Sequence, residues 1–156
     1  MNTQRREVLK SGSAAGLFGL LVAAGLITTQ QAQAAGWDKP AFEAKAMDEA
    51  LKALGAGKPA DSKDIQISGP DIAENGAVVP VGVKSALADT EFIAILIEKN
   101  PSMLAASFTL PAGTMADVST RVKMGQTSNV FALVKAGGSF YMVSKEIKVT
   151  LGGCGG

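Results

Sequence analysis

The sequence contains no histidine, and its 156 residues include a single cysteine, Cys154. The absence of histidine excludes a Ser-His-Asp triad, a Cys-His nucleophile pair and any histidine-based metal site. A single cysteine excludes a disulfide within the chain and a zinc or iron–sulfur site built from several thiolates. We therefore expect neither a catalytic centre of these classes nor a bound metal.

The sequence also lacks an excess of charge and a long apolar run. It has 15 Lys and Arg against 14 Asp and Glu, a net charge of +1 at pH 7, whereas nucleic-acid-binding domains are usually strongly basic. The apolar run at residues 14–27 is shorter than the roughly 20 residues of a membrane-spanning helix. We expect partners that are neither nucleic acid nor membrane.

Residues 1–34 instead have the three parts of an export signal. The basic residues Arg5 and Arg6 precede the apolar run, and Ala32 and Ala34 form a small-x-small pattern. This arrangement is typical of a secretory signal peptide and predicts cleavage after Ala34. The domain that follows is expected to cover residues 35–151.

The basic part of this signal resembles a bacterial twin-arginine signal. In that pattern Ser or Thr precedes the two arginines and Phe follows them, whereas this chain has Gln4 and Val8. The general secretory pathway is therefore the alternative route. Both routes lead to the periplasm.

A helix is predicted at the start of the domain. Asp38 is suited to cap its first turn, and Pro40 is tolerated there because the first helical N–H groups have no partner within the helix. Apolar residues recur at helical spacing up to Leu54, and Gly55 follows as a stop signal. The pattern predicts one amphipathic helix of about four turns.

The rest of the domain has the pattern of short strands about ten residues apart. Pro80 predicts an edge strand or a bulge because proline cannot donate to a strand ladder, and Gly137 and Gly138 predict a two-residue hairpin turn. The fold class is therefore mainly β: an antiparallel β-sandwich of immunoglobulin-like size with an N-terminal amphipathic helix. The predicted strands cover residues 64–68, 77–84, 91–98, 103–110, 118–124, 129–136 and 139–144, the last continuing through 145–151.

The last five residues stand apart from this pattern. Cys154 lies between two glycine pairs, Gly152-Gly153 and Gly155-Gly156. Free cysteine is usually buried, and an exposed thiol is a liability in an oxidising compartment unless it is used. No neighbouring residue would activate the thiol, so we interpret residues 152–156 as a flexible arm that carries a covalent group on Cys154 to other enzymes. A frayed terminus without function is the alternative.

An exported β-sandwich that ends in Gly-Gly-Cys-Gly-Gly resembles the SoxY family, the sulfur carriers of periplasmic thiosulfate oxidation. The resemblance implies that Cys154 holds the sulfur intermediates covalently, with no other cofactor, and that the chain is a carrier and not an enzyme. It also implies a heterodimer with SoxZ, another small β-sandwich. The implied enzymes are a c-type cytochrome that conjugates thiosulfate, a dimanganese hydrolase that releases sulfate, and a sulfane dehydrogenase.

Two other functions compete with this interpretation. A terminal Gly-Gly also occurs in ubiquitin-like sulfur carriers, which form a thiocarboxylate on the last glycine, here Gly156. Those proteins are cytosolic and have a β-grasp fold, so the export signal and the strand pattern argue against this function. A structural β-sandwich could instead use Cys154 for a disulfide between two chains, as an odd cysteine in an exported protein suggests.

The export signal leads to the first prediction. N-terminal sequencing of the protein from a periplasmic fraction should begin at Ala35, within one or two residues, because signal peptidase cuts after the small-x-small pattern. Recovery of the full-length chain from a membrane fraction would contradict the prediction.

Overall fold

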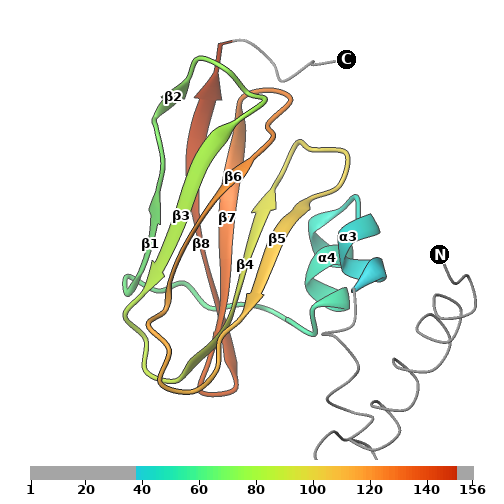
Figure 1. Ribbon diagram of the computed structural model, residues 1–156. Coiled ribbons are helices and arrows are strands. Elements are labelled where there is room, and N and C mark those ends of the chain that lie inside the picture. The colour runs from blue at the N-terminus through green and yellow to red at the C-terminus, as the bar shows by residue number, and fades with distance from the viewer. Residues whose placement is uncertain (1–37, 151–156) are drawn as a thin grey trace, which may run out of the picture. The chain divides into compact units, whose positions relative to one another are not determined.

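The computed structural model describes residues 38–150, which form two β-sheets and two short helices (Figure 1). The predicted signal residues Arg5, Arg6, Ala32 and Ala34 lie outside the described residues. The strands are β1 Ile65–Ser68, β2 Ile72–Ala73, β3 Val79–Ser85, β4 Thr90–Ile97, β5 Leu104–Thr109, β6 Asp117–Val122, β7 Ser128–Ala136 and β8 Ser139–Val149.

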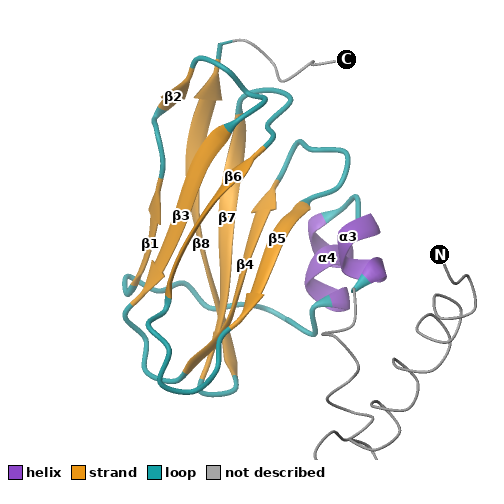
Figure 2. Ribbon diagram, viewed as in Figure 1, coloured by secondary structure: helices purple, strands orange, loops and turns teal. Residues whose placement is uncertain are grey.

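The strands form the two layers of a β-sandwich, as the sequence predicted (Figure 2). One sheet has the order β1-β3-β6 and the other β2-β8-β7-β4-β5. All strand pairs are antiparallel except that of β2 with β8, which is parallel. No strand was predicted at β2.

The N-terminal helix is broken into two, α3 Lys39–Glu43 and α4 Met47–Ala53, so the prediction of one four-turn helix is wrong. Ala44 and Ala46 between them have extended backbone angles, with ψ of 130° and 150°. The carbonyl of the buried Ala44 accepts a hydrogen bond from the Met103 N–H, at 3.2 Å. This contact with the segment before β5 replaces the hydrogen bond that would continue the helix.

The predicted ends of the helical segment are confirmed. The Asp38 carboxylate accepts a hydrogen bond from the Ala41 N–H at 3.2 Å and caps α3. At the other end Gly55 has a φ of 70°. The Gly55 and Ala56 N–H groups donate to the carbonyls of Lys52 and Leu51, the pattern of a Schellman cap.

Two apolar layers bury opposite faces of β4, so this strand is buried on both sides. Ile93, Ile95 and Ile97 lie in the core between the two sheets. Ala94 and Leu96 lie in a second cluster with residues of α3 and α4, which cover the other face beside β4 and β5 (Figure 1). The five-stranded sheet is therefore the middle layer of this part of the molecule.

Pro80 lies in the central strand of the three-stranded sheet, so its assignment to an edge strand or a bulge is wrong. Pro80 is opposite Arg121 of β6 in a continuous register. On the other side β1 ends at Ser68, opposite Gly82, and does not reach Pro80. A central strand accommodates proline here because the neighbouring ladder has already ended.

The predicted hairpin turn at Gly137-Gly138 is confirmed. It joins Ala136 of β7 to Ser139 of β8, which are paired. Gly137 and Gly138 have φ values of 55° and 77°, as a two-residue turn with two left-handed positions requires.

The middle layer leads to a prediction for stability. Leu133 is fully buried in the cluster between β7 and the helices, so Leu133→Ala should lower the free energy of unfolding by about 2–5 kcal/mol. Val78 is 55% exposed, and Val78→Ala should change it by less than about 0.5 kcal/mol. Urea unfolding of both variants is the measurement, and equal midpoints would contradict the packing of α3 and α4 against the sheet.

Candidate functional site at the end of strand β8

The predicted carrier residue Cys154 and its four glycines, Gly152, Gly153, Gly155 and Gly156, lie outside the described residues 38–150. The structure does describe the strand that leads to them. β8 ends at Val149, and Thr150 follows it. Cys154 is the fourth residue after Thr150. The position from which the C-terminal segment extends is therefore part of the described fold.

Strand β2 holds one edge of β8 at this end. Ile72 and Ala73 are paired in parallel with Lys148 and Val149. The Lys148 N–H donates to the Asp71 carbonyl at 3.0 Å, and the Thr150 N–H donates to the Ala73 carbonyl at 3.1 Å. The backbone is thus hydrogen-bonded as far as the last described residue.

A threonine side chain holds the other edge. β7 begins at Ser128, opposite Ile147, so no residue of β7 is paired with Val149. The Thr127 hydroxyl oxygen accepts a hydrogen bond from the Val149 N–H at 2.9 Å. This hydroxyl takes the place of the missing backbone acceptor.

Lys145 attaches the segment before β2 to β8. Its ammonium group donates to the Gly69 carbonyl at 2.7 Å and lies 3.0 Å from the Asp71 carboxylate. The Lys145 side chain is 29% exposed, whereas Asp71 is 91% exposed. The hydrogen bond to the carbonyl is therefore the stronger part of this interaction, because exposed ion pairs contribute little.

The strand registers place three connecting segments at the same end of the sandwich as Thr150. They are the segments that precede β3, follow β4 and precede β7. Asn100 connects two of them, because its amide donates to the Lys123 carbonyl at 2.7 Å and its oxygen accepts from the Gly125 N–H at 3.4 Å. These bonds join the end of β4 to the end of β6.

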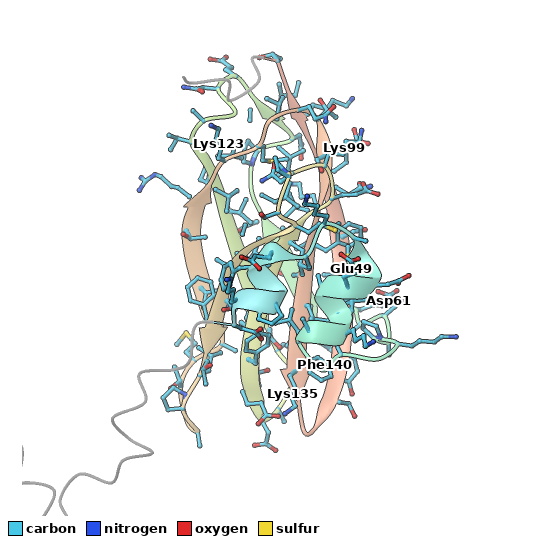
Figure 3. All side chains as sticks on the ribbon, turned by 90° about the vertical axis from the view of Figure 1, so that its right-hand side faces the viewer. Glu49, Asp61, Lys99, Lys123, Lys135 and Phe140 are labelled. Atoms are coloured by element: carbon cyan, nitrogen blue, oxygen red, sulfur yellow. The ribbon has the colours of Figure 1, made fainter. Side chains whose placement is uncertain are left out.

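Charges at this end are close to balanced. Lys99 and Lys123 are exposed there, at the opposite end from Lys135 and Phe140 (Figure 3). Exposed glutamates accompany them: Glu98 accepts a hydrogen bond from Asn129 at 3.0 Å, and Glu74 follows β2. The surface around the end of β8 therefore has no strong preference for one sign of charge.

A cavity of about 640 Å³ lies at the other end of the sandwich, near the start of β4. Its polar residues Ser85 and Thr90 are hydrogen-bonded to each other at 2.9 Å, and Thr90 also donates to the Leu87 carbonyl. Within residues 38–150, no group of acidic side chains is arranged to hold a metal, and no helix has the length and apolar character to span a membrane.

The residues that hold the end of β8 were not predicted from the sequence. The two residues of β2 follow Gly69-Pro70 and have no strand pattern of their own, and Lys145 and Thr127 look like ordinary surface residues in the sequence. Their roles depend on partners far away in the chain: Lys145 and Gly69 are separated by 76 positions. No local signal in the sequence indicates such a contact.

Known proteins provide a comparison for this arrangement. The model of a family described as sulfur oxidation protein SoxY matches residues 50–154, so the match reaches Cys154. The chain belongs to the SoxY family. A solved SoxY, the sulfur carrier protein from Chlorobium limicola f thiosulfatophilum, is 39% identical, with a TM-score of 0.61 over 67% of this chain and 96% of that chain.

The solved structures also include a superoxide reductase (neelaredoxin) from Ignicoccus hospitalis. It is 20% identical, with a TM-score of 0.48, over 67% of this chain and 90% of that chain. No curated protein matches the chain.

The attachment of β2 leads to a prediction. Lys145→Met removes the ammonium group and leaves the Gly69 carbonyl without its donor, so it should lower the free energy of unfolding by about 1–2 kcal/mol. Lys148→Met, three residues along β8, is the matched control, since the exposed Lys148 side chain has no hydrogen bond within the described residues. Thermal unfolding of both proteins checks this, and equal losses would contradict a specific role for Lys145.

Proposed function

We propose that this SoxY-family protein is the sulfur carrier of a periplasmic thiosulfate-oxidising system and that Cys154 is its attachment site. The observation that carries the proposal is the family match, which extends through the only cysteine of the chain. The solved relative that is 39% identical is itself described as a sulfur carrier protein. The described fold supports this function because it ends in a firmly held strand just before the cysteine.

The proposed chemistry begins with conjugation of thiosulfate to the cysteine. The Cys154 thiol and thiosulfate form an S–S bond, the thiol proton is released, and two electrons pass to a c-type cytochrome. Water then cleaves the bond between the sulfane sulfur and the sulfone group, so that sulfate and one proton leave and a persulfide remains on Cys154. A sulfane dehydrogenase then removes six electrons from the outer sulfur of the persulfide and passes them to a c-type cytochrome, while three water molecules supply the oxygens of an S-sulfonate and seven protons are released. Hydrolysis of the S-sulfonate releases a second sulfate and one proton and restores the Cys154 thiol.

Under this proposal the chain supplies a thiol on a narrow segment and its partners supply the catalysis. The glycines on both sides of Cys154 have no side chains, so the segment can enter a narrow cleft in each enzyme. Catalysis requires positioning within about 1 Å, which each enzyme would provide in its own active site. The protein is then a substrate carrier and not an enzyme.

A heterodimer with SoxZ is part of the proposal. The edge strand β5 has none of the charged or proline residues that usually protect an exposed edge. An uncharged edge of this kind supports association with a second β-sandwich by strand addition.

The alternatives differ in where the sulfur is held. A ubiquitin-like carrier would bear it on the Gly156 carboxylate, and the two-sheet fold argues against that β-grasp function. A structural protein would use Cys154 only for a disulfide between chains. Intact mass and peptide mapping of protein from thiosulfate-grown cells distinguish these outcomes, and our proposal expects a sulfur adduct on Cys154.

The carrier role leads to a further prediction. Cys154→Ser should abolish thiosulfate-dependent cytochrome reduction in a reconstituted system, because Ser cannot form the S–S bond. The variant should unfold at the wild-type temperature and bind SoxZ normally, since the change follows the last described strand and leaves the described core intact. Iodoacetamide treatment of the wild type, which blocks the only thiol, is the control for the same loss. Substantial turnover by the Ser variant would contradict the proposal.

A further inference from the structure

One methionine of the described fold lies in solvent. Methionine is usually a buried residue, yet the Met115 side chain is 76% exposed, more than the exposed Ile72 at 56% and Val78 at 55%. Met103 and Met124 are only 3% and 0% exposed. Reagents in solvent therefore reach the thioether group of Met115 directly, whereas the fold shields those of Met103 and Met124.

Met115 lies in a loop that the fold holds at both ends. The loop, residues 111–115, joins β5 to β6, and all five of its residues are exposed. Before the loop, the Leu110 N–H donates to a carbonyl of β4 at 2.9 Å, and after it the Ala116 carbonyl accepts from the last N–H of β3 at 2.9 Å. The fold thus fixes the two ends of this loop and leaves its side chains accessible to other molecules.

The Met115 side chain also lies outside the packed core. It lines the cavity near the start of β4, where Leu87 and Leu110 are among its apolar neighbours in the wall. Among residues 38–150, two apolar clusters form the core, and Met115 belongs to neither, whereas Met124 lies in the cluster between the sheets. An oxygen atom on the Met124 sulfur would bury a polar group, but one on the Met115 sulfur would stay in contact with water. The fold therefore tolerates oxidation at Met115.

We propose that Met115 is a site of reversible oxidation, at which hydrogen peroxide forms a sulfoxide and a methionine sulfoxide reductase removes it. In the first step the sulfur donates an electron pair to one peroxide oxygen, the O–O bond breaks, an S–O bond forms, and water leaves. The sulfur loses two electrons and the peroxide gains them. In the reverse step two reductase thiols become a disulfide, and the sulfoxide oxygen leaves as water. This inference goes beyond the proposed function and does not depend on Cys154.

Both steps require access to the sulfur, and the exposed loop gives access to peroxide and to a reductase. The modification also changes the cavity, because a sulfoxide is polar and the thioether that it replaces is apolar. The wall that Met115 shares with Leu87 and Leu110 becomes more polar while the core stays unchanged. Oxidation at this position thus alters one surface of the sandwich without altering its packing.

Peptide mapping during peroxide treatment tests the site. The mature chain is first treated with iodoacetamide to block Cys154, and samples are then taken over time in hydrogen peroxide. Met115 should be oxidised at least about tenfold faster than Met103 and Met124, because only its side chain is open to solvent. Met115→Leu is the matched variant, since leucine is similar in size and has no sulfur. It should lack the fast phase and keep the slow oxidation of the other methionines.

Two further measurements test whether the modification is tolerated and reversible. Protein oxidised only at Met115 should have the wild-type midpoint in urea, because no core contact is lost. The two methionine sulfoxide reductases, one for each epimer of the sulfoxide, should return the folded protein to its original intact mass. A lowered midpoint, or a sulfoxide that is reduced only after unfolding, would overturn the inference.

The same time course in the complex with SoxZ tests the site in the heterodimer of the proposed function. Met115 should remain the fastest methionine there, and protection of Met115 by SoxZ would overturn its assignment as an oxidation site. Oxidation of Met103 or Met124 as fast as Met115 would also overturn it. Activity of Cys154→Ser would refute the carrier function and leave the Met115 results unchanged, so the two failures are distinguishable.

Discussion

The backbone ladder between β7 and β8 is the interaction on which the rest of the structure depends. The two strands are paired from the turn at Gly137-Gly138 as far as Ser128 and Ile147. The turn joins neighbours in the chain, so closing this hairpin costs little entropy. Along the other edge of β8, the Ala60 N–H donates to the Phe140 carbonyl at 2.9 Å, and the Ala60 carbonyl accepts from the Met142 N–H at 2.8 Å. Further along the same edge, β8 is paired with β2. Segments on both sides of β1 are thus attached to one strand.

The same ladder supports both apolar layers. Along β8, Tyr141 and Val143 contact the core between the sheets, and the alternating Phe140 and Met142 contact the cluster under the helices. Within residues 38–150, every buried side-chain nitrogen or oxygen has a hydrogen-bond partner. The described residues therefore form a packed body whose buried polar side chains are all hydrogen-bonded within the fold.

A tightly packed body of this kind is suited to a carrier protein, which presents a covalently bound chemical group to other enzymes. A cavity lies at the end of the sandwich away from Thr150, and the hydroxyl groups of Ser85 and Thr90 in its wall are bonded to each other and to the backbone. At the end near Thr150, Asn100 joins the end of β4 to the end of β6, and the hydroxyl group of Thr127 accepts a hydrogen bond from the Val149 N–H. Under the proposed function, the chemistry belongs to the Cys154 thiol, and the described fold supports the strand that leads to it.

The fold class, most of the strands and the family could be predicted from local patterns in the sequence, and its only cysteine indicated the proposed carrier residue. Each of these features depends on only a few adjacent residues. They are the strand alternation, the Gly137-Gly138 turn, the Asp38 cap and the terminal Gly-Gly-Cys-Gly-Gly. Tertiary structure decided the break at Ala44, the central position of Pro80 and the existence of β2. Each depends on a distant partner: Met103 for Ala44, the early end of β1 for Pro80, and Lys145 with β8 for β2. Local propensity could not predict them, because a hydrogen bond across many intervening residues forms only once the sheets have brought its two groups together.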